Sequence, residues 1–249
     1  MIDGRYDNWR IAGHDNDTQG DECNFDIVER IGSPSTAGIV YKLKNGHALK
    51  IMPIIDMNSI SDNEREIMIA TIASDSESPY FLRVYGSGSC ENFIYSKHEE
   101  TFRILSLAYD GKCEVNYLIS ELGLMDLNSW MTRYDEDMVP VFVREVIEGI
   151  IWLQEHNIIH SDLHIYNVLI VKRDNRLSAC IHDFGLSFIG IARFQYYVDY
   201  KIFLMSIKDK LHKGTFKDWM SSLLVNLPSD WDSVNDKRDF MKFILKKYF

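Results

Sequence analysis

The chain has 249 residues, of which 46% are hydrophobic, and it carries a formal net charge of −10 at pH 7. This length suits one bilobal domain or two small ones, and the apolar content is enough for a sizeable core. The acidic balance argues against nucleic-acid binding through net charge, and no stretch approaches the roughly 20 apolar residues of a membrane span, so neither partner is expected.

The start of the sequence and its cysteines predict the compartment. No basic segment followed by an apolar one opens the chain, so no signal peptide is expected. The cysteines are Cys23, Cys90, Cys113 and Cys180. They form no CxxC pair, which favours free or buried thiols over a zinc site. We therefore expect an intracellular, cytoplasmic protein, with residues 1–24 as an acidic, flexible extension.

After this extension, the first half of the chain reads mainly as strands. The β-rich segments Phe25–Arg30 and Gly38–Leu43 flank a stretch of turn-forming residues, 32–37. A second turn at Asn45-Gly46 leads into His47–Met52, which predicts a β-hairpin.

One helix interrupts these strands. It is expected to start near Ser59 or Ser61 and to turn Ile67 and Met68 toward the core, as their helical spacing indicates. Tyr117–Ser120 then reads as a buried strand.

From Asp126 onward the apolar period becomes that of helices, broken by a short hairpin whose turn is Asp174-Asn175. The predicted elements are Leu127–Arg133, Val141–His156, Val168–Lys172, Leu177–His182, Tyr200–Leu211, Phe216–Val225 and Arg238–Tyr248. We therefore predict an α+β fold with a β-rich lobe over residues 25–121 and a helical lobe over residues 122–249.

Two polar segments flank the predicted hairpin. The first is His160-Ser161-Asp162-Leu163-His164-Ile165-Tyr166-Asn167, and the second is His182-Asp183-Phe184-Gly185. Asp and Asn are common turn formers, which is the alternative explanation. However, an Asp, an Asn five residues on, and an Asp-Phe-Gly after two strands resemble the catalytic and metal-binding loops of protein kinases.

This resemblance implies a bilobal protein-kinase-like fold and a division of roles. Asp162 would orient the acceptor hydroxyl and receive its proton, because phosphoryl transfer leaves the protein mainly positioning and charge neutralisation to do. Asn167 and Asp183 would supply the oxygen ligands that Mg²⁺ prefers, with Mn²⁺ as an alternative. His164 stands where serine/threonine kinases usually carry a lysine that contacts the γ-phosphate, and it would donate a hydrogen bond there.

The resemblance also implies partners for these residues in the first half of the chain. Lys50 resembles the lysine that holds the α- and β-phosphates of ATP. On the following helix, Glu64 is the preferred carboxylate to pair with it, because Ile67 and Met68 would then face the core, and Glu66 is the alternative. The remaining nucleotide contacts implied by the glycine loop, the hinge and the adenine pocket are Gly32, Gly38, Val40, Ala48, Glu121, Gly123, Asp126 and Leu169.

The sequence departs from the family in four ways. Gly32 and Gly38 are one residue further apart than the family's first and third glycines. Ser161 replaces the arginine of His-Arg-Asp, so no basic anchor for a phosphorylated activation loop is present there. Asp199 resembles the buried aspartate that braces the catalytic loop, yet it follows Asp183 by only 16 positions, with no Ala-Pro-Glu motif between them.

This short segment resembles that of the small kinase subunit of the KEOPS complex, of RIO-type kinases and of compact kinases of large DNA viruses. The Asp-Leu-His before Asn167 is also similar to aminoglycoside and choline phosphotransferases. We predict a compact serine/threonine protein kinase that uses Mg²⁺-ATP and a protein substrate. The alternatives are a partner-dependent ATPase or kinase subunit of a complex, a small-molecule phosphotransferase, and a pseudokinase that acts as a binding module.

Overall fold

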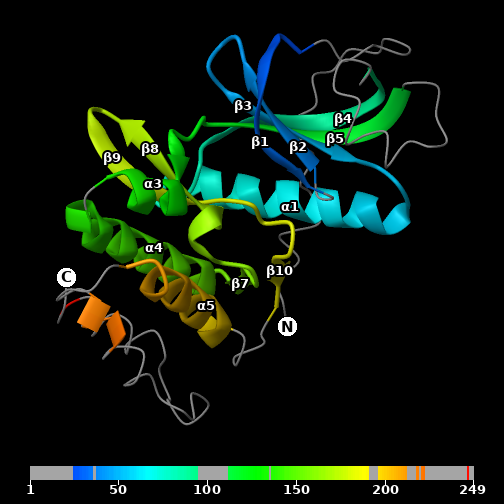
Figure 1. Cartoon of the computed structure of the whole chain (residues 1–249). Coiled ribbons are helices and arrows are strands. Elements are labelled where there is room, and N and C mark those ends of the chain that lie inside the picture. Colours follow the sequence, from blue (N-terminus) through cyan, green and yellow to red (C-terminus); the bar gives the residue numbers. More distant parts are fainter. Residues whose placement is uncertain are drawn as a thin grey trace. The chain divides into compact units, whose positions relative to one another are not determined.

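The computed structural model describes residues 25–35, 38–94, 112–134, 136–190, 196–211, 217–218, 220–221 and 246 (Figure 1). The extension 1–24 lies outside these residues, as does most of the two predicted helices Phe216–Val225 and Arg238–Tyr248. The chain divides into two compact units, Met1–Glu64 with Val84–Glu121 and Arg65–Arg83 with Leu122–Phe249.

The first unit is built on a five-stranded antiparallel sheet in the order β1-β2-β3-β5-β4. Its strands are β1 (Ile27–Ser35), β2 (Gly38–Leu43), β3 (Ala48–Pro53), β4 (Val84–Ile94) and β5 (Lys112–Ser120). The predicted β2–β3 hairpin is confirmed. It turns at Gly46, which has a φ of 85° and donates its amide to the Leu43 carbonyl at 2.9 Å.

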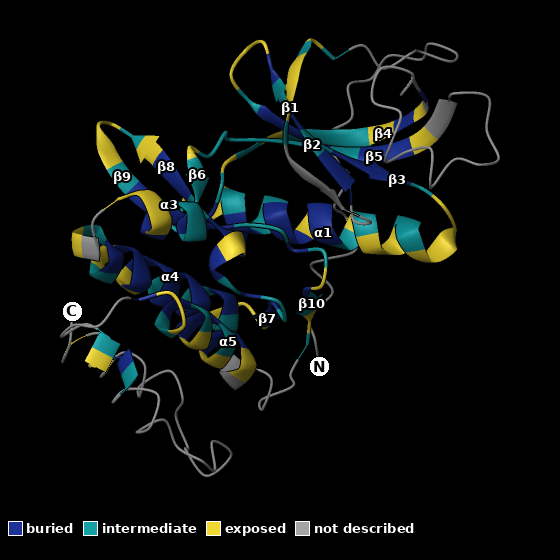
Figure 2. Ribbon diagram, viewed as in Figure 1, coloured by how far each residue is buried: buried dark blue, intermediate teal, exposed yellow. Residues whose placement is uncertain are grey.

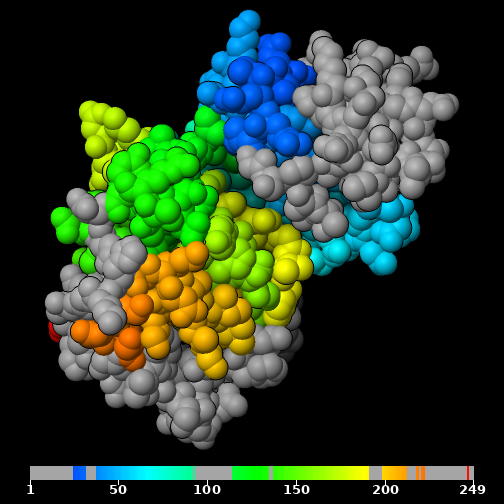
Figure 3. Space-filling model, in the orientation of Figure 1, coloured from blue at the N-terminus to red at the C-terminus, as the bar shows by residue number. Residues whose placement is uncertain are grey.

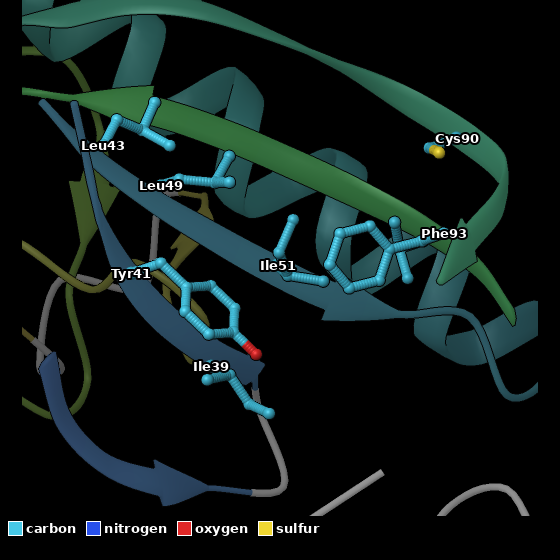
Figure 4. Packing of buried hydrophobic residues seen from close by; sticks show 8 residues of the cluster. Ile39, Tyr41, Leu43, Leu49, Ile51, Cys90 and Phe93 are labelled. Atoms are coloured by element: carbon cyan, nitrogen blue, oxygen red, sulfur yellow. The ribbon is translucent and has the colours of Figure 1, made fainter. Parts of the chain in front are cut away.

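One face of this sheet carries the apolar core of the first unit. Alternate residues of the strands point to the same face, so Ile39 and Tyr41 of β2 meet Leu49 and Ile51 of β3 (Figure 4). Val115 of β5 is fully buried in the same cluster. The opposite face therefore carries the other set of alternate residues, among which the predicted nucleotide contacts lie.

Helix α1 (Met57–Asp75) begins two residues before the predicted start at Ser59. The reason is a reciprocal cap, in which the Ser59 amide donates to Asp56 Oδ1 at 2.8 Å and the Asp56 amide donates to Ser59 Oγ at 2.9 Å. Ile67 is buried as predicted, but Met68 is 41% exposed, so the expectation that Met68 faces the core is wrong. Ile69 is buried in place of Met68, so the buried face of α1 includes Ile67, Ile69 and Ala70.

The second unit is largely helical. Its elements are β6 (Met125–Asp126), α3 (Leu127–Arg133), η1 (Glu136–Met138), α4 (Val139–Glu155), β7 (Ile158–Ile159), η2 (Ile165–Asn167), β8 (Val168–Arg173), β9 (Arg176–Ile181), β10 (Phe188–Ile189) and α5 (Tyr196–Lys208). The sheets are β6-β8-β9 and β10-β7. A sheet unit followed by a helical unit confirms the predicted α+β class.

Helix α4 is the central support of the second unit and is mostly buried (Figure 2). Gly149 allows α4 to approach β9 closely, because a Cβ there would lie 2.8 Å from Ile181 Cδ1. Glu145 faces the same strand and accepts the Ala179 amide at 2.7 Å. The β8–β9 hairpin is thereby fixed on α4, and its two ends carry the polar segments of the candidate site.

The cysteines differ from the expectation in one respect. Cys90 is disulfide-bonded, so the prediction of free thiols is wrong at that position, whereas Cys180 is free and buried. In the part of the chain that the structure describes, no helix combines the length and the apolar character of a membrane span.

Candidate active site

The polar segment that begins at His160 is anchored by Asp199 of α5. Asp199, which is 1% exposed, accepts the amides of His160 at 2.9 Å and of Ser161 at 2.8 Å, one on each carboxylate oxygen. Ser161 has a φ of 68°, a left-handed conformation that few residues other than glycine adopt without support. In Figure 3 the yellow-green surface of this segment lies directly beside the orange surface of α5.

The charge state of Asp199 reflects two opposing effects. Burial raises the pKa of its carboxyl above the ordinary value, while the nearby His160 and the two backbone N–H groups lower that pKa. Burial is the larger effect, so the pKa of Asp199 is raised overall, although each of its two carboxyl oxygens accepts one backbone N–H group.

Asp162 and Asn167 are brought together as predicted. The Asn167 side-chain amide donates to the Asp162 backbone carbonyl at 2.9 Å and lies 3.3 Å from Asp162 Oδ2. Asn167 is buried, whereas the Asp162 side chain is 41% exposed. His164 Nε2 lies 3.6 Å from Asp162 Oδ2, so the histidine is a neighbour of this carboxylate. A water-accessible carboxylate with a fixed backbone is suited to accept a proton.

The second polar segment is placed next to the first by backbone bonds. The His182 amide donates to the Asn167 carbonyl at 3.1 Å, and the His182 carbonyl lies 3.0 Å from His160 Nε2. Asp183 follows with a φ of 63°, again in the left-handed region. Phe184 is buried and packs its ring 5.2 Å from that of His160. These contacts keep Asn167 and Asp183 adjacent in space.

Asn167 and Asp183 fit a magnesium ion by their donor chemistry. Both present oxygen, and Mg²⁺ is usually held by one or two protein oxygens together with water and phosphate oxygens. Among the residues that the structure describes, no group of three or more His, Cys, Asp or Glu side chains could hold a metal ion alone.

The buried carboxylate of α1 is Glu66. It is 3% exposed, and a Cβ built on Gly185 would lie 3.3 Å from its Oε2 and 3.6 Å from Asp183 Oδ1. The carboxylates of Glu66 and Asp183 therefore both lie beside Gly185. Glu64 is exposed. The preference for Glu64 over Glu66 depended on Met68 facing the core, and the structure favours Glu66.

In the first unit, the predicted nucleotide residues share the sheet face opposite the core cluster. Lys50 of β3 pairs with Val40 of β2 and with Leu118 of β5, and side chains of directly paired residues lie on one face. Ala48, two residues before Lys50, lies on the same face. Leu118 was not among the nucleotide contacts predicted from the sequence. The alternation of side chains along β5 nevertheless places Leu118 on the other face of the sheet from Tyr117 and Ile119.

The two glycines assigned to the predicted loop differ in their constraints. Gly38 opens β2 with a φ of 141°, and a Cβ there would lie 2.4 Å from the Ile51 carbonyl oxygen, so only glycine fits. Gly32 lies within β1, which runs to Ser35. The strand thus extends into the stretch that was expected to form a turn.

The residues assigned to the hinge and adenine pocket have distinct placements. Gly123 and Leu169 are in contact, since a Cβ on Gly123 would lie 2.9 Å from Leu169 Cδ1. Glu121 is half-buried just after β5. Asp126 is the N-cap of α3, where its carboxylate accepts the Ser129 amide at 2.7 Å and the Ser129 hydroxyl at 2.8 Å. These bonds use one acceptor position on each carboxylate oxygen of Asp126, the residue assigned to the ribose.

Known proteins match the region that contains these residues. A family model described as protein tyrosine and serine/threonine kinase matches residues 56–208. The match begins after Lys50 and includes Glu66, Asp162, Asn167 and Asp183.

Individual relatives are distant. The chain is 29% identical over 138 residues to an Aurora kinase of Encephalitozoon cuniculi, covering 55% of this chain and 43% of that protein. It is 28% identical over 167 residues to serine/threonine-protein kinase 4 homolog A of Dictyostelium discoideum, covering 66% of this chain and 31% of that protein. The chain therefore spans less than half the length of either relative.

Proposed function

Because this chain belongs to the protein tyrosine and serine/threonine kinase family, we propose that it transfers the γ-phosphoryl group of ATP to a serine or threonine hydroxyl of a protein. One observation carries this proposal. Asn167 bonds to the Asp162 carbonyl, and the Asn167 carbonyl accepts the amide of His182, so hydrogen bonds hold together the two loops that carry Asp162, Asn167 and Asp183. The name of the Dictyostelium relative supports serine or threonine as the acceptor.

Each polar group has a proposed role. Asp162 accepts the proton of the attacking hydroxyl, and His164 beside it donates a hydrogen bond to the γ-phosphate. Asn167 and Asp183 are the proposed Mg²⁺ ligands, with Mn²⁺ as an alternative. The bound metal supplies positive charge that offsets the charge of the transferred phosphoryl group.

The proposed nucleotide contacts are those that the resemblance implied. Lys50 is the proposed cation for the α- and β-phosphates, and Glu66 replaces Glu64 as the proposed carboxylate of α1. Backbone amides near Gly38 are proposed to approach the phosphates, and Val40 and Ala48 to contact adenine. Gly32, Glu121, Gly123, Asp126 and Leu169 remain proposed contributors to the same nucleotide site.

A second candidate is a partner-dependent ATPase or kinase subunit. The observation that favours it is the short connection after Asp183, since β10 ends at Ile189 and α5 already begins at Tyr196. Residues 190–195 leave little chain for a peptide-docking platform, which a partner chain could supply. Since ATP is the proposed donor, we place either activity in the cytoplasm.

The experiment is a transfer assay with γ-labelled ATP, Mg²⁺ and a generic protein substrate such as casein. Asp162→Asn removes the proton acceptor and keeps the shape, so labelling is expected to fall by about 10²–10⁴-fold while nucleotide binding persists. Asp174→Asn is the matched control, because Asp174 is exposed in the β8–β9 turn and has a φ of 48°, which asparagine also tolerates.

The outcomes separate the candidates. Label on protein that is lost in Asp162→Asn and kept in Asp174→Asn supports the proposed kinase. Equal labelling by wild type and Asp162→Asn would overturn it. ATP hydrolysis that appears only with a co-purified partner supports the second candidate, and label confined to a metabolite fraction indicates a small-molecule phosphotransferase.

A further inference from the structure

Arg65 of α1 reaches the segment that follows Asp183. Its Nε donates to the Ser187 carbonyl at 2.8 Å, and its Nη2 lies 3.5 Å from the Gly185 carbonyl oxygen. Arg65 directly precedes Glu66, the buried carboxylate beside Gly185. Two consecutive residues of α1 thus contact the same short stretch of backbone.

Ser187 also bonds to the catalytic loop, so it connects Arg65 to that loop. Its side chain is fully buried, and its hydroxyl donates to the His160 carbonyl at 3.1 Å. The Ser187 amide also donates to the Phe184 carbonyl at 2.9 Å, which closes a turn directly after Asp183. A single residue therefore joins Arg65, the turn and the loop.

The series of bonds ends at α5. The amide of His160 donates to Asp199 at 2.9 Å, so hydrogen bonds run from Arg65 through Ser187 and His160 to Asp199. Asp183 lies beside this series with a φ of 63°. Aspartate tolerates this left-handed region better than most residues, and the hydrogen-bonded turn that follows Asp183 fixes it there.

We propose that Arg65 is a positioning residue for phosphoryl transfer, which holds the backbone of Gly185–Ser187 so that Asp183 keeps its left-handed backbone conformation, with a φ of 63°. This inference rests on the proposed kinase function. Arginine suits the role because its planar guanidinium presents several N–H donors in a fixed fork, which can serve two carbonyls at once. A lysine ammonium is a point charge and would serve one carbonyl less selectively.

The test compares Arg65→Gln and Arg65→Lys with the wild-type chain. The control is Arg144→Gln, because Arg144 is a half-exposed arginine of α4 whose ion pair with Glu148, at 2.9 Å, is of the surface type that contributes little. The measurements are kcat and KM for a generic protein substrate, the Mg²⁺ concentration for half-maximal rate, and hydrogen–deuterium exchange across residues 183–190.

For Arg65→Gln we expect kcat to fall about 10–100-fold, since small displacements of catalytic groups have effects of this size. The Mg²⁺ requirement should rise, and KM for the protein substrate should stay within about twofold because Arg65 makes no proposed contact with it. Exchange should accelerate in residues 183–190 and stay unchanged in α4. Arg65→Lys should recover part of kcat, and Arg144→Gln should match wild type.

Two results would overturn the role of Arg65. One is an Arg65→Gln variant with wild-type kcat and Mg²⁺ dependence. The other is faster exchange throughout α4 and the 183–190 segment alike, which indicates a general loss of stability. If the wild-type chain itself transfers no phosphate, the proposed function fails. The comparison of hydrogen–deuterium exchange in residues 183–190 and in α4 then still tests whether Arg65 holds the segment.

Discussion

The two bonds from Asp199 to the catalytic loop can be tested by Asp199→Asn. The asparagine amide has the same shape but keeps only one oxygen, and its NH₂ group is a donor. One of the two amides at 2.9 and 2.8 Å, that of His160 or of Ser161, therefore loses its acceptor. The left-handed φ of 68° at Ser161 then loses part of its support.

The magnitude follows from two opposing contributions. A buried N–H group without a partner costs about 1–3 kcal/mol. Removing a carboxylate whose pKa burial raises relieves part of its desolvation cost. We expect a net fall of about 1–2 kcal/mol in the free energy of unfolding. Since Asp162 directly follows Ser161, the transfer rate should also fall about 10–100-fold.

Urea denaturation followed by tryptophan fluorescence measures the first quantity, and the labelled-ATP assay measures the second. Asp209→Asn is the matched control, because Asp209 is exposed just beyond α5 and should leave both unchanged. If Asp199→Asn unfolds at the wild-type urea concentration and transfers phosphate at the wild-type rate, the carboxylate does not hold the loop and the reasoning is refuted.

Two further predictions concern single residues of each unit. Gly38→Ala should lower the thermal unfolding temperature far more than Gly46→Ala, because a Cβ at Gly38 would lie 2.4 Å from a backbone oxygen whereas nothing lies within 4 Å of one at Gly46; equal shifts would contradict this. Burial, together with a hydrogen bond to Glu148, raises the pKa of Tyr80 from 10.0 to about 12. The unfolded chain therefore ionises first as pH rises, so the stability advantage over Tyr80→Phe should be complete below pH 10 and be lost between pH 10 and about 12. A difference between the two proteins that is independent of pH would disprove the assignment.

Local signals in the sequence predicted most of the strand and loop arrangement. The turn at Asp174-Asn175 has φ values of 48° and 65°, which are the conformations that these residue types favour, so the β8–β9 hairpin could be located from two letters. The pairing of Asn167 with Asp162 could likewise be predicted, because the residues are five positions apart and share one short loop.

The face of α1 could not be predicted with the same certainty. One turn of an α-helix takes 3.6 residues, and the run Ile67, Met68, Ile69 fits more than one choice of buried face, so the spacing alone does not decide which carboxylate points inward. The cap at Asp56 sets the true start, and the stripe of Ile67, Ile69 and Ala70 then buries Glu66. The same local rule of an aspartate three residues before a serine identifies Asp126 as a helix cap.

The contacts of Arg65 were beyond sequence reasoning for a different reason. Its partners are two backbone carbonyls more than 100 positions away, and carbonyls leave no signature in a sequence. Only Ser161, where the resemblance calls for an arginine, indicated that the loop must be held by other means.

The segment between Asp183 and Gly190 is short and is held in place at both ends. Its distal end is fixed by the pairing of β10 with β7 and by the Gly190 amide, which donates to the Asn157 carbonyl at 2.9 Å. Its proximal end is fixed by Ser187 and Arg65. Ordering one residue costs about 1–2 kcal/mol of backbone entropy, so a short segment needs only a handful of such bonds to stay in place. These bonds connect loops to one another and contribute little to the apolar cores. Substitutions that break them should therefore lower the rate of phosphoryl transfer more than they lower the stability of the second unit.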